Sequence, residues 1–328
     1  MKKHPILHTI TSIIALAVFV MAIFVLRHEA RGHSMQDVII ALGQLSRLRL
    51  ALAFCLTTAY YIVLTTYDAL AFRFIKHKLP YLDVALASFI GHAFSNSLGF
   101  APITSGSLRF RIYSQKGVTP MQILNVIAFT SITFWLGFLT VATALFLIAP
   151  PVIPSSFNIP FETARPLGFL FLLAIILWLG WSTLRHRKEF TLCGHTFCFP
   201  PLRISLLQMG LASLEWLFSA GIVFTLIPSS GNVPYHAFLG VFLLAQIAGL
   251  ISQIPGGLGV FESIVLALMS GTVPVPAVMA TLFVYRLFFN ILPLALAILL
   301  IGLRELKHRH KHVLSFLRRV KDESSGAK

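Results

Sequence analysis

The sequence predicts an all-α polytopic membrane protein built as an inverted repeat, and three observations lead to this prediction. Hydrophobic residues make up 57% of the 328 residues and charged residues only 11%, whereas soluble proteins carry roughly 25% charged residues. Several apolar runs reach the ~20 residues needed to cross a bilayer. Two further apolar stretches, at residues 81–113 and 236–271, are interrupted by Gly and Pro. This composition excludes a soluble globular enzyme.

The charge balance favours a membrane surface over nucleic acid as the basic protein's partner. Lys and Arg number 26 and Asp and Glu 11, which gives a formal net charge of +15. In a polytopic membrane protein such an excess is typical of cytoplasmic loops that lie beside anionic lipid. We therefore expect membrane and phospholipid as partners and no nucleic acid.

Uninterrupted apolar runs account for most of the expected transmembrane helices. The first, residues 9–26, is too long for the core of a signal peptide and lacks a small-residue cleavage site, so we expect a retained anchor. Residues 31–46 form a mixed, partly amphipathic stretch suited to the membrane interface. Further spans are expected at residues 48–75, 121–149, 167–184, 204–227 and 276–303.

Each interrupted stretch is expected to form a helix, a break and a second helix. Pro removes a backbone donor and Gly weakens a helix. Non-helical backbone at membrane depth is tolerated only where protein surrounds it or where it lines a cavity. The residues that we assign to the breaks are Gly99, Pro102 and Gly106 in the first stretch and Pro255, Gly256, Gly257 and Gly259 in the second.

The two interrupted stretches also match one another. Ser95-Asn96 stands 157 residues before Ser252-Gln253, and the flanking spans keep nearly the same spacing. We infer an internal repeat in which each unit is a long span, a broken hairpin and a second long span. The expected segments are an anchor and interfacial segment at 1–46, repeat 1 at 47–149, a linker span with a cytoplasmic β-hairpin loop at 150–202, repeat 2 at 203–303 and a basic cytoplasmic tail at 304–328.

The loop between residues 185 and 203 has two interpretations. Cys193, His195 and Cys198 could bind zinc, but the sequence offers no second pair of ligands nearby. Alternating apolar residues on both sides of a Cys-Gly-His turn are typical of a β-hairpin. We favour the hairpin and expect no metal and no other cofactor.

Basic residues predict the orientation of the two units, because loops rich in Lys and Arg face the cytoplasm. Basic segments occur at 73–78, 109–116, 185–203 and 304–321, whereas 150–160, 228–234 and 271–274 contain neither Lys nor Arg. With both termini in the cytoplasm, the first hairpin then enters from the inside and the second from the outside. The segment 27–49 is discordant, since it is basic yet assigned to the outside. Inverted repeats with broken helices are an architecture of alternating-access transporters, although such features also serve helix packing alone.

Two motifs in this order resemble a known family. The first is SNSLGFAPITSGSLRFRIY at residues 95–113, and the second is SQIPGGLGVFE at residues 252–262. Together they are similar to the transmembrane region of the lysylphosphatidylglycerol synthase/flippase family, that is, the multiple peptide resistance factor proteins and their single-domain relatives. The resemblance covers most of the chain. It implies a multi-pass protein of the bacterial inner membrane that moves a phospholipid, with aminoacylated phosphatidylglycerol among the candidates, between leaflets.

The resemblance also implies what the chain does not do. In bifunctional members a soluble aminoacyl-transferase domain follows this region, whereas the present sequence stops in its basic tail. We therefore expect transport rather than enzymatic chemistry, with a second copy of the chain or a separate lipid-modifying enzyme as candidate partners. Two alternatives stay open, namely a small-solute or ion transporter and a non-catalytic scaffold for a lipid-modifying enzyme.

Polar and charged residues near the breaks are the candidates for substrate binding. Arg109, Arg111 and Tyr113 follow the first break, and two guanidinium groups at this spacing could hold a lipid phosphate from both sides of a short extended or turn segment. The alternative is that the arginines only anchor the topology. Glu262, at the start of a returning half-helix, suits a cationic amine or a proton. The neutral candidates, which could equally bond to neighbouring helices, are Ser95, Asn96, Ser252 and Gln253.

Three further ionisable residues lie inside expected spans and are functional candidates, because charge is costly there. Glu215 and Arg286 lie near the centres of their spans and could pair with each other, as a static contact or as a gate. Asp68 lies closer to the cytoplasmic end and is expected to pair with Arg73. We interpret His92 as a hydrogen-bonded packing residue rather than a proton relay.

Overall fold

The computed structural model describes residues 34–99, 101–150, 163–184, 189–192, 195–228, 233–269 and 271–304. Within these ranges six helices are long and apolar enough to cross a membrane. The predicted class, an all-α polytopic membrane protein, is therefore confirmed. The expected first span at 9–26, the turn residue Cys193 and the tail beyond Arg304 lie outside the described residues.

The helices follow the expected spans to within a few residues. In chain order they are α2 (Met35–Gly43), α3 (Arg47–Phe74), α4 (Tyr81–Leu98), α5 (Ala101–Ser114), α6 (Pro120–Ile148), α7 (Arg165–Leu184), α8 (Leu202–Leu226), α9 (Tyr235–Ser252), α10 (Val260–Met269) and α11 (Val275–Arg286). A short 3-10 turn, η3 (Pro255–Gly257), separates α9 from α10. The last helix continues through a π-helical turn, η4 (Leu287–Ile291), as far as Arg304.

Two short strands form the predicted β-hairpin between α7 and α8. β1 (Glu189–Leu192) pairs antiparallel with β2 (His195–Cys198), and Phe190 stands opposite Phe197. The hairpin interpretation is therefore confirmed. Within the described residues, no group of three His, Cys, Asp or Glu side chains is placed to hold a metal ion.

Contacts at the helix ends show the direction in which the long helices run. Arg49, at the start of α3, donates a 3.3 Å hydrogen bond to the carbonyl of Ile227, just after α8. Thr281, in the middle of α11 and in the first part of the last helix, donates to the carbonyl of Leu226 at 3.0 Å. At the other end of the molecule, Arg304 donates to Gln115, shortly before α6, at 3.0 Å. α3 and α8 therefore run in opposite directions, and the last helix ends beside the end of α5.

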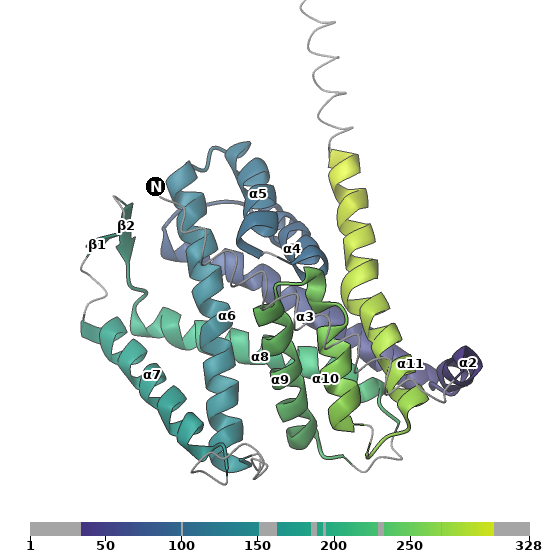
Figure 1. Ribbon diagram of the computed structural model, residues 1–328. Helices are drawn as coiled ribbons and strands as arrows, with labels where there is room; N and C mark the ends of the chain where they lie inside the picture. The colour runs from purple at the N-terminus through teal and green to yellow at the C-terminus, as the bar shows by residue number, and fades with distance from the viewer. Residues whose placement is uncertain are drawn as a thin grey trace, which may run out of the picture.

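The two helical hairpins approach one another from opposite ends of the molecule. Figure 1 shows α4 and α5 in the upper part of the view and α9 and α10 in the lower part, with the bends between them. α3 and α8, one from each expected repeat, pack closely together near the centre. This geometry is the one that an inverted repeat requires. The repeat relation itself and its orientation in a membrane stay predictions.

Small residues permit a close crossing between α6 and α8. A Cβ added at Gly137 would lie 2.3 Å from the Cβ of Ala212, so only glycine fits there. In the same interface the Gln208 side chain donates to the Thr133 hydroxyl at 2.7 Å. Small residues and polar side-chain bonds are the usual means of holding helices together in lipid.

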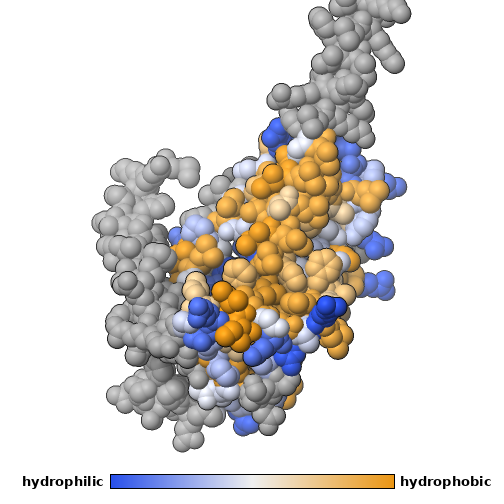
Figure 2. Space-filling model, turned by 90° about the vertical axis from the view of Figure 1, so that its right-hand side faces the viewer, coloured by the Kyte–Doolittle hydropathy of each residue, from blue (hydrophilic) through white to orange (hydrophobic). Residues whose placement is uncertain are grey.

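Large apolar side chains cover the outward faces of several helices. α7 exposes Phe169, Leu170, Ile176 and Leu177, and the last helix exposes Phe283, Ile291, Ile298 and Leu299. Figure 2 shows apolar side chains gathered over a broad area of the face on which the last helix lies. Exposed apolar surface of this extent is suited to lipid contact and is rare on a soluble monomer.

The first break is shorter than the sequence suggests. α5 already begins at Ala101, so Pro102 and Gly106 lie inside a helix and are not part of the break. Pro is tolerated in the first helical turn because no intrahelical acceptor awaits its missing N–H. The hydroxyl of Thr104 reaches back to the carbonyl of Gly99 at 2.9 Å and so satisfies a backbone acceptor at the bend. The break is confined to the neighbourhood of Gly99.

Candidate functional site

The two hairpin bends touch one another through their backbones. Gly99 has a φ of +72° and Gly256 a φ of +61°, both in the left-handed region. A Cβ on Gly256 would lie 2.9 Å from the carbonyl oxygen of Ser97, and a Cβ on Gly99 would lie 3.4 Å from the backbone nitrogen of Gly256. Glycine is required at Gly256 for both its conformation and the space around it. The sequence placed both glycines in breaks, and the structure brings them together.

A charged pair lies at this contact, and we call Glu262 and Arg286 the junction pair. Arg286 Nε donates to Glu262 Oε1 at 2.5 Å, and Arg286 Nη1 donates to the carbonyl of Gly256 at 2.8 Å. Glu262 Oε2 accepts the backbone N–H of Gly259 at 2.8 Å, at the start of α10. The two side chains keep 15% and 16% of their surface exposed. The junction pair is therefore compensated but still accessible.

The π-helical turn carries Asn290 to the same place. Its Nδ2 donates to the carbonyl of Asn96 at 2.8 Å, and its backbone carbonyl accepts the Ser97 hydroxyl at 3.2 Å. Arg286 Nη1 also reaches Asn290 Oδ1 at 3.4 Å. Single π turns inside α-helices often mark functional sites. The last helix is thus bonded to the tips of both hairpins.

The neutral candidates divide between the junction and the hairpins themselves. Asn96 donates to the hydroxyls of Tyr60 and Tyr61 on α3 at 3.1 and 3.4 Å, so it lies within the junction network. Ser252 is fully buried and bonds to Gly249 and Ile254 of its own hairpin, which makes it a turn residue. Ser95 is half-buried, and Gln253 ends α9 as an exposed residue.

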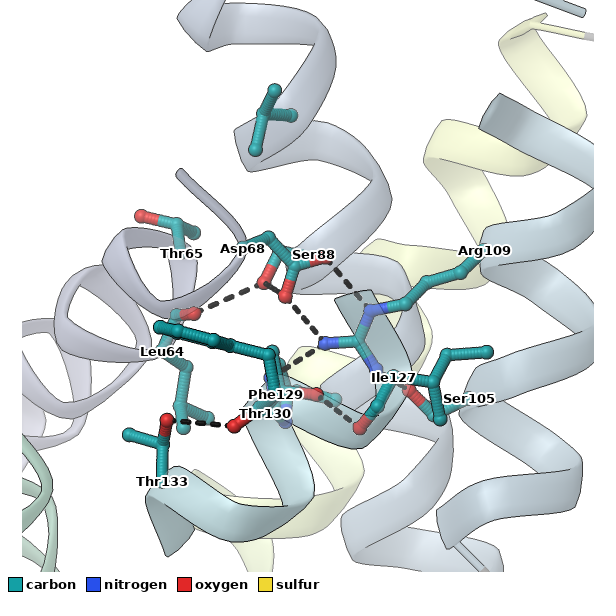
Figure 3. Close-up of polar contacts among 12 residues, drawn as sticks. Leu64, Thr65, Asp68, Ser88, Ser105, Arg109, Ile127, Phe129, Thr130 and Thr133 are labelled. Atoms are coloured by element: carbon teal, nitrogen blue, oxygen red, sulfur yellow. Dashed lines mark hydrogen bonds and ion pairs between the residues drawn. The ribbon is translucent and has the colours of Figure 1, made fainter. Parts of the chain in front are cut away.

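A second charged pair ties the first hairpin to α3, and we call Asp68 and Arg109 the sealed pair. Arg109 Nε donates to Asp68 Oδ2 at 2.8 Å and Arg109 Nη2 donates to Asp68 Oδ1 at 2.7 Å. Only 3% of Arg109 and 0% of Asp68 are exposed. Figure 3 shows the guanidinium pointing at the carboxylate, with Ser88 and Ser105 beside it. This two-bond geometry is the strongest form of an Arg–carboxylate contact.

Surrounding polar groups complete the bonding of the sealed pair. Asp68 also accepts from the Tyr113 hydroxyl at 2.6 Å and the Ser88 hydroxyl at 3.1 Å. Arg109 bonds to the Ser105 hydroxyl and lies 2.8 Å from His92 Nε2. A polar network that is satisfied in this way rigidifies its surroundings. α3, α4 and α5 are therefore held together as one unit, and His92 is hydrogen-bonded as expected.

The structure corrects two predictions about these side chains. In one of the two interpretations, Arg109 and Arg111 hold a phosphate from both sides of an extended or turn segment, but both lie on α5, where residues two apart point roughly 200° away from each other. Arg109 is committed to Asp68, whereas Arg111 is exposed. Asp68 was expected to pair with Arg73, but its partner is Arg109, which is 41 residues away. Tyr113, another substrate candidate, is buried against Asp68.

Glu215 and Arg286, which the sequence suggested as one possible pair, do not pair with each other. Arg286 is bonded to Glu262, whereas Glu215 accepts a hydrogen bond from the Tyr67 hydroxyl on α3. Among the residues that the structure describes, no cation forms an ion pair with Glu215. Its carboxyl group is nearly buried, with 5% of the residue exposed.

Sequence reasoning missed several members of these networks. Asn290 stands four residues after Arg286, a spacing that places both on one helix face. Its position beside Arg286 could therefore have been predicted from the sequence. Tyr60, Tyr61 and Tyr67 carry hydroxyls into the middle of an apolar helix, and a search for such groups would have found them. The roles of Ser88 and Ser105 depend on the packing of α4 and α5, so no local sequence pattern predicts them.

Comparison with known proteins identifies relatives of this chain. No family model matches the chain. The protein slr0712 of Synechocystis is 35% identical over 299 residues, which cover 91% of this chain and 92% of that protein. The inner membrane protein YbhN of Escherichia coli is 29% identical over 299 residues, covering 91% of this chain and 93% of YbhN.

A longer relative matches over the same region. The phosphatidylglycerol lysyltransferase of Staphylococcus xylosus is 26% identical over 294 residues, which cover 87% of this chain but only 33% of that enzyme. The chain thus corresponds to about a third of the enzyme's length. With these relatives and the helical membrane fold, the chain belongs to the lysylphosphatidylglycerol synthase/flippase transmembrane-region family.

Proposed function

We propose that this protein is a translocase that moves a phospholipid between the leaflets of the bacterial inner membrane. Its similarity to an inner membrane protein and to a phosphatidylglycerol lysyltransferase supports a role in membrane lipid biology. The lysyltransferase match covers a third of that enzyme, and we propose transport without lysyl transfer for this chain. Phosphatidylglycerol and its aminoacylated form are the substrates to test first.

The observation that carries this proposal is the junction pair at the contact between the two hairpin bends. Arg286 lies beside the Gly256 carbonyl of one bend, and its neighbour Asn290 bonds to the other. Broken helices that meet in this way form the substrate sites of many transporters with inverted repeats. Because Glu262 and Arg286 are only partly exposed, a charged ligand that reaches them loses much of its water but finds charges to replace it.

The chemistry of the junction pair matches a phospholipid headgroup. A guanidinium binds phosphate through directed hydrogen bonds, and a carboxylate binds the ammonium group of an aminoacylated or zwitterionic lipid. When such a headgroup enters, Arg286 exchanges Glu262 for phosphate while Glu262 exchanges Arg286 for the amine. With an aminoacylated or zwitterionic headgroup every charge keeps a partner throughout, which avoids the high free energy of an unpaired charge inside a membrane. Phosphatidylglycerol has no amine and would leave Glu262 without a partner, so the mechanism favours the aminoacylated form.

The sealed pair has a positioning role in this mechanism. Asp68 and Arg109 fix α5 against α3. They thereby hold the first bend in contact with the second bend, where the junction pair lies. Arg111, exposed near the end of α5, is proposed to attract the phosphate at the cytoplasmic surface. We also propose that both chain ends lie in the cytoplasm and that the chain divides into the five segments given above. Its proposed partners are a second copy of the chain or a separate lipid-modifying enzyme.

Reconstitution into liposomes tests the proposal. Fluorescent phosphatidylglycerol and its lysyl form would be placed in both leaflets, and an impermeant quencher would report the fraction that crosses. We expect exchange above empty vesicles in the wild type and strong loss in Arg286→Gln, while Lys116→Ala, a change in an exposed pair with Asp83, serves as the matched control. Exchange equal to that of empty vesicles would overturn the proposal. Uptake of a water-soluble solute without lipid exchange would instead favour the small-solute transporter, and neither activity would favour the scaffold.

A further inference from the structure

Glu215 has surroundings unlike those of the other two intramembrane carboxylates. Asp68 and Glu262 each face an arginine, whereas Glu215 has no cationic partner among the described residues. The hydrogen bond recorded for its carboxyl group comes from the Tyr67 hydroxyl. An ionised carboxylate in such a place has a high free energy, and taking up a proton removes the charge. The function proposed above gives Glu215 no task.

The groups around Glu215 do not supply a compensating charge. α3 contributes the hydroxyls of Tyr60 and Tyr67, and the ring of Tyr67 lies 6.4 Å from the ring of His92 on α4. The last helix contributes Tyr285 and Arg286, and Arg286 is bonded to Glu262. α6 contains no ionisable side chain. The ionisable residues of α7 and α9 lie at the helix ends and are Arg165, Tyr235 and His236.

We infer that Glu215 is a proton-binding site that couples lipid movement to the proton gradient across the membrane. This inference rests on the proposed translocase function. It assigns a ligand, the proton, to a carboxyl group that the headgroup site leaves unused. The step is a simple acid–base equilibrium in which the carboxylate gains a proton from one compartment and releases it to the other, while Tyr67 donates its hydrogen bond to the carboxyl group in both states.

The position of Glu215 explains how a proton would influence transport. The residue lies on α8 and bonds to α3, so it sits in the contact between the two expected repeats. Alternating access requires the repeats to move against each other. A neutral carboxyl group is compatible with the closed contact, whereas an ionised one favours a conformation that admits water or a cation. Protonation therefore shifts the balance between closed and open contacts.

Infrared difference spectroscopy tests the proton site without any transport assay. Purified protein in nanodiscs would be titrated, and the C=O stretch of a protonated carboxylic acid would be followed. Other carboxyl groups of the chain also titrate, so the assignment rests on the difference between variants. We expect one titrating band that is present in the wild type and in Glu262→Gln to be missing in Glu215→Gln. An unchanged band in Glu215→Gln would overturn the assignment. Glu215→Asp and a thermal melt of each variant separate loss of the group from loss of the fold.

Liposomes with an imposed pH gradient test the coupling. We expect the gradient to change the rate of lipid exchange by about tenfold in the wild type, since coupling between sites usually changes affinity by about 5-fold to 150-fold. In Glu215→Gln the rate of lipid exchange should not depend on the pH gradient, and in Glu215→Asp the dependence on the gradient should return. Lipid exchange that is insensitive to the gradient in the wild type overturns the coupling but leaves the translocase intact. Absence of any lipid exchange overturns both, even where the infrared band titrates.

Discussion

The sealed pair and the junction pair use the same chemistry in different surroundings. Each consists of one arginine and one carboxylate, and each ties a hairpin to a long helix. Asp68 and Arg109 have almost no exposed surface, and their remaining hydrogen-bonding groups meet Tyr113, Ser88, Ser105 and His92. Glu262 and Arg286 keep about one sixth of their surface exposed and bond to the backbone of a bend.

Under the proposed function, this difference separates a structural role for the sealed pair from a transport role for the junction pair. A pair that is fully enclosed cannot exchange partners without exposing an unpaired charge, so it serves to hold helices together. A pair that remains accessible can pass from one partner to another with small rearrangements. Mutation of the sealed pair should therefore mainly lower stability, whereas mutation of the junction pair should mainly lower transport. Variants of each pair test this difference.

Breaking the sealed pair should have the largest effect. Asp68→Asn leaves the Arg109 guanidinium buried without its counter-ion, and removal of one partner of a buried pair typically lowers stability by about 3–5 kcal/mol. We expect little folded protein after purification and a clearly lowered melting temperature in detergent. The double variant Asp68→Asn with Arg109→Gln should be less damaged than the single one. A single variant as stable as the wild type would remove the distinction between the two pairs.

Breaking the junction pair should impair transport more than folding. Hydrogen bonds to charged groups contribute about 1.5–3 kcal/mol, which corresponds to a loss of about tenfold to a hundredfold in rate. We expect Glu262→Gln and Arg286→Gln to lower lipid exchange by this factor with a modest change in melting temperature. Normal exchange rates in both variants would show that the headgroup site lies elsewhere.

Adding one methyl group at the contact between the bends should have a smaller effect. Gly256→Ala forces a non-glycine residue into the left-handed region, at roughly 1–2 kcal/mol, and brings its Cβ to 2.9 Å from the Ser97 carbonyl oxygen. We expect a lower melting temperature and slower lipid exchange. Gly210→Ala is the matched control, because its Cβ would meet nothing within 4 Å. Equal behaviour of the two variants would contradict the close contact of the bends.

The exposed pair between Lys116 and Asp83 should matter least. Its side chains are 37% and 27% exposed, and surface ion pairs contribute at most about 1 kcal/mol. Lys116→Ala should change neither melting temperature nor lipid exchange beyond a small shift, which high salt should abolish. A loss as large as that of Asp68→Asn would show that burial does not separate these pairs.

The long helices could be predicted because their cause is local. A run of apolar residues such as Pro120–Ile148 leaves few alternatives to a span, and Thr119 adds a capping box with Gln122 at its start. The bend at residues 255–259 was equally readable, because Pro and clustered Gly exclude a continuous helix. The first bend was predicted too long, since the small polar residues after Gly99 fold into α5, where the Thr104 hydroxyl bonds to the Gly99 carbonyl at the bend.

The charged pairs could not be assigned because their partners are distant in sequence. Arg109 was assigned to a cytoplasmic loop, which left Asp68 to a nearby arginine and Glu215 to Arg286. Once α5 is known to bury Arg109, two arginines serve two of the three carboxylates and Glu215 is left over. The packing of the first hairpin decides the partner of Asp68, and the packing of the second hairpin against the last helix decides the partner of Arg286. No local spacing contains that information.

Labelling of engineered cysteines shows whether the two hairpins enter the membrane from opposite sides, as an inverted repeat requires. Cys55, Cys193 and Cys198 would be replaced by Ser, and Ser114→Cys or Gly271→Cys would then be added at the open end of one hairpin or the other. In right-side-out membrane vesicles, an impermeant maleimide should label the Gly271→Cys variant at once and the Ser114→Cys variant only after the vesicles are opened. Labelling of both variants from the same side would contradict the account.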